Sequence, residues 1–88
     1  MVVEAITSQV ICLNKCQITD VFIYANGADA TISLYDGENT KGVKKITLFA
    51  KDGYSNNISP SGDWIFERGC YVEVNATTTE VVIWYKNV

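Results

Sequence analysis

Apolar and polar side chains alternate along most of the chain, and short glycine-containing segments separate the alternating stretches. A period of two residues, with many β-branched and aromatic side chains, is typical of β-strands. The pattern predicts strands at residues 2–12, 16–25, 30–35, 43–49, 64–67, 71–76 and 80–86. Turns are predicted at Asn26-Gly27, Asp36-Gly37, Asp52-Gly53 and Ser61-Gly62. Residues 52–61 are expected to form one long surface loop.

Short strands at this spacing predict an all-β fold, a small antiparallel β-sandwich that is jelly-roll-like. The 88 residues are enough for a single domain, so residues 1–88 are expected to form one sandwich. On each strand the alternation also predicts which side chains point into the core. This predicted core consists of Ile32, Leu34, Ile46, Leu48, Trp64, Phe66, Val72, Val74, Val81, Ile83 and Tyr85.

Two segments, residues 21–25 and 81–85, are apolar on both faces of their strands. One sandwich core covers only one of these faces, so the other face needs a cover. Either the N-terminal segment of the same chain covers it, or another molecule does. The second hypothesis predicts an interaction surface that includes Phe22, Tyr24, Val82 and Trp84, with Tyr54 of the long loop added as a further exposed aromatic side chain.

The composition and net charge of the chain disfavour several classes of function. Hydrophobic residues make up 48% of the chain and charged residues 19%, which is typical of a folded domain. The net charge of −3 disfavours nucleic acid as a partner, because binding to phosphates relies on lysine and arginine. No apolar run is long enough to predict a membrane span. The N-terminus does not resemble a signal peptide, so we expect assembly in a cytoplasm.

The residues that usually carry catalysis are scarce. The chain contains no histidine, so the commonest general base and metal ligand are both missing, and we predict no enzyme, no catalytic residue, no metal and no cofactor. Three cysteines, Cys12, Cys16 and Cys70, are too few for a four-ligand zinc site. We expect them to be free thiols, with a single disulfide as the alternative.

From Ala28 onward, the order of features resembles that of small β-sandwich proteins in tailed-bacteriophage particles, capsid decoration (cement) proteins among them. The segments that carry the resemblance are residues 30–37, Gly42 with residues 46–50, Pro60, and residues 64–66, 69–74 and 80–85. The region over which they are spread, from Ala28 onward, makes up roughly two-thirds of the chain. The N-terminal segment before Asn26 lies outside the matching pattern.

The resemblance implies a structural protein on the capsid surface of the virion. Its partner would be the major capsid protein, and the protein itself would be a homo-oligomer, with a trimer favoured. It would stabilise the head by binding neighbouring capsid subunits in many copies. Two alternatives stay open: a minor virion protein of the neck, tail or fibre, and a small carbohydrate-binding module that uses exposed aromatic side chains such as Tyr54 or Trp84.

Overall fold

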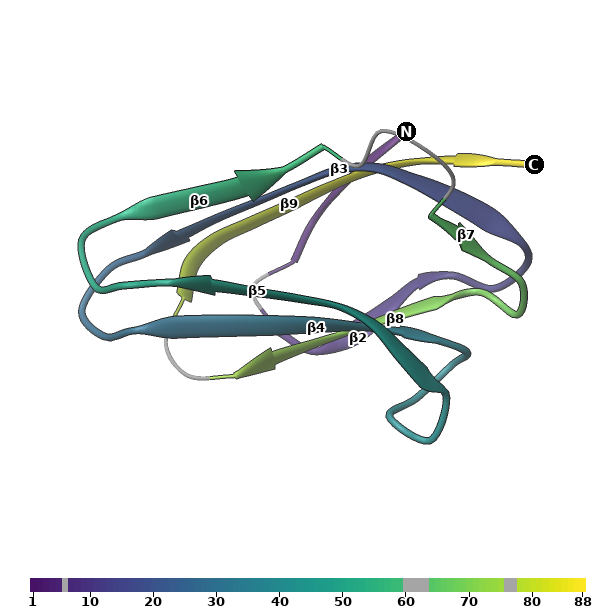
Figure 1. Cartoon of the computed structure of the whole chain (residues 1–88), viewed down its shortest axis with the longest axis horizontal. Coiled ribbons are helices and arrows are strands. Elements are labelled where there is room, and N and C mark those ends of the chain that lie inside the picture. Colours follow the sequence, from purple (N-terminus) through teal and green to yellow (C-terminus); the bar gives the residue numbers. More distant parts are fainter. Residues whose placement is uncertain (6, 60–63, 76–77) are drawn as a thin grey trace.

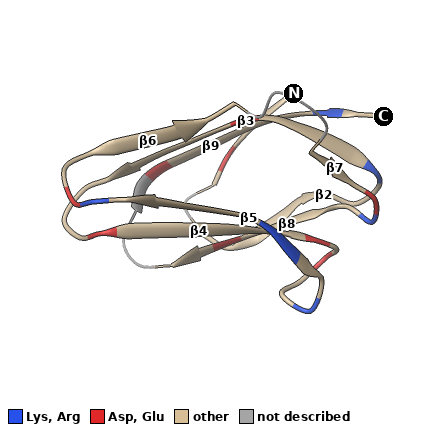
Figure 2. Ribbon diagram, in the orientation of Figure 1, with Lys and Arg blue, Asp and Glu red and all other residues tan. Residues whose placement is uncertain are grey.

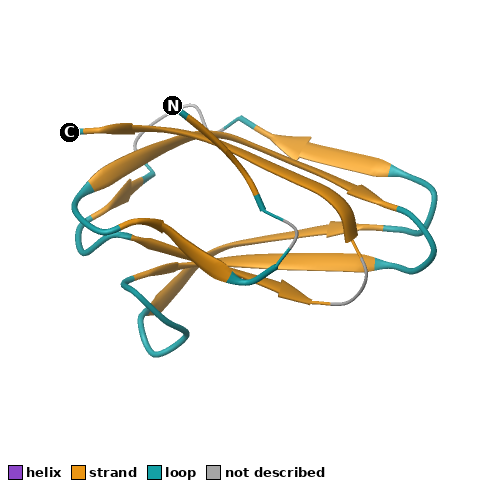
Figure 3. Ribbon diagram, turned by 180° about the vertical axis from the view of Figure 1, so that it is seen from behind, coloured by secondary structure: helices purple, strands orange, loops and turns teal. Residues whose placement is uncertain are grey.

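The computed structural model describes residues 1–5, 7–59, 64–75 and 78–88, and this part of the chain forms nine strands in two antiparallel sheets (Figure 1). The strands are β1 (Val2–Glu4), β2 (Gln9–Cys12), β3 (Cys16–Ala25), β4 (Ala30–Asp36), β5 (Val43–Ala50), β6 (Ser55–Ile58), β7 (Ile65–Phe66), β8 (Cys70–Asn75) and β9 (Thr78–Asn87). Sheet A has the order β1-β9-β3-β6, with β7 also pairing with β3. Sheet B has the order β2-β8-β4-β5. No helix occurs among the described residues, so none is available there to span a bilayer (Figure 3).

The strands pair in a nested order. The first strand pairs with the last (β1 with β9), and the next pairs inward are β2 with β8, β3 with β6, and β4 with β5. The pairing of β3 with β9 joins two of these strand pairs into sheet A, and the pairing of β4 with β8 joins the other two into sheet B. This nested pairing is the arrangement of a jelly roll. The predicted all-β sandwich of jelly-roll type is therefore confirmed.

The core lies between the two sheets and follows the predicted alternation. Of the side chains predicted to point inward, eight are buried: Ile32, Leu34, Ile46, Leu48, Phe66, Val72, Val81 and Ile83. The other three, Trp64, Val74 and Tyr85, are partly buried and pack against the same cluster. Since alternate residues of a strand point to opposite faces, the strands and their core-facing sides could be predicted from one pattern.

The predicted N-terminal strand, residues 2–12, is wrong as a single element. It consists of β1 in sheet A and β2 in sheet B, and the chain crosses between the sheets from one to the other. The backbone N–H of Ala5 still donates to the carbonyl of Val81 on β9 (2.8 Å). The hydroxyl of Ser8 then accepts a hydrogen bond from the N–H of Val74 on β8 (2.9 Å).

The predicted long loop at residues 52–61 is also wrong in part, because it contains β6. This strand has the polar sequence Ser-Asn-Asn-Ile and forms the edge of sheet A beside β3. The predicted turns at Gly27, Gly37 and Gly53 lie between strands, and all three glycines have positive φ. The predicted turn at Ser61-Gly62 lies outside the described residues.

The prediction of three free thiols is wrong for two of the cysteines. Cys12 ends β2 and Cys16 begins β3, and a disulfide joins them across the short connection between the two sheets. Cys70 is a free and fully buried cysteine on β8, opposite Cys12 in the pairing of β2 with β8. Just before it, Gly69 has a φ of 109°, and a Cβ there would lie 2.5 Å from the carbonyl oxygen of Cys12. Only glycine fits this close approach of the two chain segments.

Candidate functional site: the outward face of sheet A

Sheet A presents a group of apolar side chains on the side that faces away from the core. Val82 and Trp84 alternate on β9 with the buried Val81 and Ile83, so both point outward. Phe22 and Tyr24 do the same on β3, and Val2 completes the group on β1. We call these five residues, Val2, Phe22, Tyr24, Val82 and Trp84, the apolar face.

The strand register brings members of the apolar face together from three strands. Phe22 lies opposite Val82 across β3 and β9. Trp84 lies opposite Val2 across β9 and β1. Residues directly opposite each other on one face of a sheet have their Cβ atoms about 4.5–5.5 Å apart. The side chains therefore form one continuous strip over the middle of the sheet, with β9 at its centre.

The N-terminal segment does not cover this strip. β1 pairs with β9 and forms the edge of sheet A. The pairing continues at Met1, whose ammonium group donates to the carbonyl of Tyr85 (2.8 Å). As a result Trp84 is 40% exposed and Val2 54% exposed, while Phe22, Tyr24 and Val82 are half-buried by their neighbours. The described residues of the N-terminal segment thus leave the outward side of β9 uncovered.

The outward face of sheet B has a different character. Its central aromatic side chain, Tyr35, donates a hydrogen bond from its hydroxyl to Glu73 Oε1 on the neighbouring β8 (3.0 Å). The ammonium group of Lys44 lies 5.7 Å from the centroid of the same ring. Ser33 lies on the same side of β4 and opposite Thr47 of β5. Polar neighbours therefore surround Tyr35 at the centre of this side. Val10, Val43 and Phe49 are also exposed on sheet B, but they lie on its outer strands, β2 and β5.

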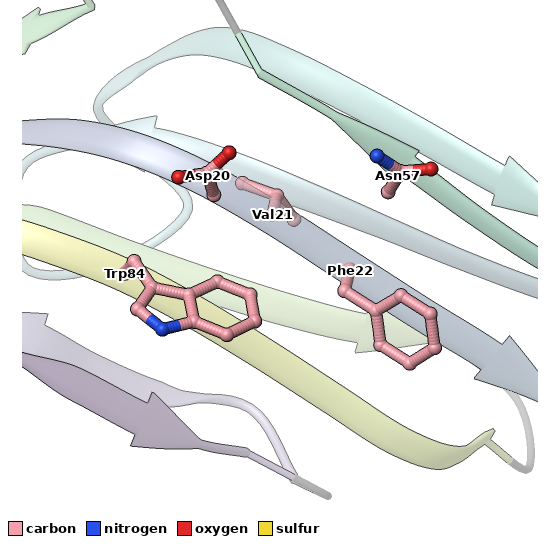
Figure 4. Close-up of a pocket in the computed structure, with 5 residues that line it drawn as sticks. All are labelled: Asp20, Val21, Phe22, Asn57 and Trp84. Carbon is pink, nitrogen blue, oxygen red and sulfur yellow. The ribbon is translucent and has the colours of Figure 1, made fainter.

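A shallow hollow lies within the apolar face (Figure 4). Its volume is about 240 Å³, and it is lined by Trp84, Phe22, Val21, Asp20 and Asn57. The aromatic rings of Trp84 and Phe22 lie on one side, and the polar groups of Asp20 and Asn57 lie along the other. The hydroxyl of Ser59 donates to Asp20 Oδ1. The hollow is smaller than the roughly 300–1,000 Å³ typical of small-molecule pockets.

Carboxylates surround the apolar face. Glu4 lies opposite Val82, Asp20 opposite Trp84, and Glu80 opposite Tyr24. We call these three residues, Glu4, Asp20 and Glu80, the acidic rim. Among the described residues, one pair of oppositely charged side chains has its nitrogen and oxygen within 4.0 Å, Lys15 and Glu67 (3.7 Å). The carboxylates of the acidic rim therefore have no described cationic side chain within that distance. The register of β1, and with it the places of Val2 and Glu4, could not be predicted from local sequence.

The remaining sequence-predicted residues do not add chemistry to this face. Tyr54 is exposed, but it lies in the connection between β5 and β6 and not on a strand of the apolar face. The thiol of Cys70 faces the core, where burial, together with the carboxylate of Asp36, raises its pKa to about 12. A thiol of this kind is a poor nucleophile at neutral pH. In the described part of the chain, no three His, Cys, Asp or Glu side chains are grouped as metal ligands would be.

Comparisons with known proteins do not identify a relative: no protein-family model, no curated protein and no solved structure matches the chain. The function has to be inferred from the geometry of the sandwich and its surfaces. Among the described residues, the apolar face brings together large apolar side chains from three neighbouring strands and lies beside the carboxylates of the acidic rim.

Proposed function

We propose that this protein is a non-catalytic structural component of a virus particle, a capsid decoration (cement) protein of a tailed bacteriophage that attaches through its apolar face. The apolar face is the observation that carries the proposal. Soluble monomers seldom leave a contiguous group of large apolar side chains exposed, and such a group usually marks a protein-binding surface. Tryptophan and tyrosine, both present here, are enriched among the residues that dominate binding energy at interfaces.

The sequence resemblance to small virion proteins supports the choice of partner. The partner would be the major capsid protein, and the place of action would be the outer surface of the head. Many copies would bind equivalent positions of the lattice, grouped as trimers as the resemblance implies. Each contact needs only modest affinity, because binding at several linked sites raises the overall affinity without new interactions.

The absence of histidine from the sequence supports a binding role over catalysis. The jelly roll supports it too, since this architecture occurs in viral capsid and lectin domains. Architecture alone does not assign a function, so the argument rests on the apolar face. The alternative place in a virion, the neck, tail or fibre, would be distinguished by imaging labelled protein on intact particles. A decoration protein would appear all over the shell, and a tail component at one vertex.

A carbohydrate-binding role would use the same hollow, with Trp84 stacking on a sugar ring and Asp20 and Asn57 bonding its hydroxyls. The hollow is too small and open for this use alone, and the apolar residues extend well beyond it on three strands. We therefore favour a protein partner. Specific binding on a glycan array that is lost in Trp84→Ser would reverse this preference.

The proposal is tested with capsids assembled without this protein. Wild-type protein is expected to co-sediment with them, and Trp84→Ser is expected to bind at least about 30-fold more weakly, the effect of losing an interface residue worth about 2 kcal/mol. Phe49→Ser is the matched control, because Phe49 is also aromatic and is 51% exposed, but lies on β5 in sheet B. Its binding should equal that of the wild type. Absence of wild-type binding, or equal losses in both variants, would contradict the proposal.

A further inference from the structure

The two sheets differ in the charges that their strands carry. The strands of sheet A contain three carboxylates, Glu4, Asp20 and Glu80, and a single cationic side chain, Lys86. The strands of sheet B contain two of each sign, Asp36 and Glu73 with Lys44 and Lys45. Figure 2 shows the lysine pair on β5 of sheet B, and the ammonium group of Lys45 donates to the carbonyl of Ile65 on β7 (2.6 Å). The surface around the apolar face is therefore acidic.

This charge matters as soon as the apolar face is covered. A partner that buries Trp84 and Val82 also comes close to Asp20 and Glu4, which lie opposite them in the sheet. Removing a carboxylate from water without a partner is energetically unfavourable, and a cation with good geometry offsets that loss. Like charges brought together across an interface add a further penalty. The partner surface consequently has to supply positive charge at the margin of an apolar centre.

We infer that the partner of the apolar face is a protein surface that presents lysine or arginine side chains around an apolar centre. The inference rests on the proposed docking role and specifies the chemistry of its partner. Three carboxylates select a cationic surface, and the five apolar side chains between them select a hydrophobic one. A wholly polar basic surface would leave Trp84 unburied, and a wholly apolar one would leave the acidic rim unpaired.

A second copy of this chain, docked face to face, fits these requirements poorly. The one cation on the strands of sheet A, Lys86, would have to serve the three carboxylates of the opposing copy. A two-fold contact brings the same surface from both copies together, so the unpaired carboxylates would occur twice. If the protein forms a trimer, the copies should therefore meet through another surface.

The test uses the whole protein and two matched double variants. Glu4→Gln/Glu80→Gln removes two charges of the acidic rim, and both residues are exposed. Glu38→Gln/Glu67→Gln removes the same number of charges from exposed positions outside sheet A. The first probe is a synthetic peptide of alternating leucine and lysine, compared with its leucine-glutamate counterpart. Binding is followed by intrinsic tryptophan fluorescence, which comes from Trp64 and Trp84. The variant Trp84→Phe keeps Trp64 and shows which part of the change comes from the apolar face. The second probe is the capsid assembled without the protein.

The expected result is binding of the lysine peptide but not of the glutamate peptide, weakened about tenfold or more in Glu4→Gln/Glu80→Gln and less than about threefold in the control pair. Raising the salt concentration from 0.05 M to 0.5 M should weaken the binding further, since the screening length shortens to a few ångströms. Thermal melts establish that each variant is folded.

Equal losses in the two double variants would mean general attraction to an acidic protein and would overturn the inference. Self-association of the wild-type protein that is lost in Trp84→Ser would also overturn it, because a second copy would then be the occupant. Capsid binding that is insensitive to Glu4→Gln/Glu80→Gln would leave the proposed function standing and refute the inference alone. Selective binding of the lysine peptide without any capsid binding would support the inference and refute the proposed function.

Discussion

Val81 and Val82 are neighbours on β9, and the same substitution at each distinguishes the core from the apolar face. Val81 is 1% exposed and points between the sheets, whereas Val82 is half-buried and points outward. Valine to alanine removes the same atoms at both positions and carries the same loss of β-propensity. Any difference in the free energy of unfolding between the two variants therefore reports the burial of the two side chains.

The expected difference follows from the burial. Val81→Ala removes two buried methyl groups, worth about 1.6 kcal/mol at about 0.8 kcal/mol each, and the cavity left behind brings the loss to about 2–3 kcal/mol. Val82→Ala removes groups that already contact water in part, so we expect a loss of about 0.5–1 kcal/mol. For a domain of this size each kcal/mol corresponds to about 4–8 °C in Tm, which predicts a decrease of about 8–24 °C for Val81→Ala and less than about 8 °C for Val82→Ala.

The assay is urea unfolding and thermal unfolding of both variants, followed by circular dichroism. The slope m should be the same in both, because the surface exposed on unfolding hardly changes. Equal losses of stability would refute the assignment of the two faces. They would mean either that the outward side of β9 is covered within the chain, or that β9 is shifted by one residue, which would exchange its two faces.

Two further predictions concern other parts of the sandwich. Gly69→Ala should lower the free energy of unfolding, measured in urea, by more than Gly53→Ala does. Both glycines have positive φ, but a Cβ at position 69 would meet the carbonyl oxygen of Cys12, whereas a Cβ at position 53 would lie in open space. Equal losses would contradict the close approach at Gly69. The pKa of Cys70 is raised to about 12 from 9.0 by burial and by Asp36, so the unfolded chain loses this proton first and stability should fall as pH rises from about 9 to 12. Cys70→Ala should lack this part of the pH dependence, and the same decline in Cys70→Ala would contradict the assignment.

The alternation of apolar residues was enough to predict most strands and their inward sides. β3 has the predicted bounds, residues 16–25, because polar or glycine-containing segments flank it. Its buried and half-buried side chains alternate on either side of a register shift between Ile18 and Asp20. The same pattern predicted that Phe22, Tyr24, Val82 and Trp84 point away from the core. Their exposure agrees with this placement, although their role in an interface remains a proposal.

Other features depend on contacts distant in sequence. β6 has a polar sequence that is typical of a turn, and it is a strand because the backbone of β3 offers it a pairing edge. The break between β1 and β2 depends on which sheet each pairs with, and local alternation carries no such information. The disulfide of Cys12 and Cys16 likewise depends on the chain changing sheets between them. The sequence alone also did not predict Val2 in the apolar face or Glu4 in the acidic rim, because their positions follow from the register of β1 on β9.

The position of the apolar face within the fold bears on how it would bind. β3 and β9 are the inner strands of sheet A and pair with each other along almost their whole length. The residues that alternate with the apolar face, Val21 and Ile23 on β3 and Val81 and Ile83 on β9, are all buried in the core. Core packing thus fixes the backbone positions from which the outward side chains project. A partner would meet a surface that is already ordered, so little conformational entropy would be lost on binding and even a small contact could be stable.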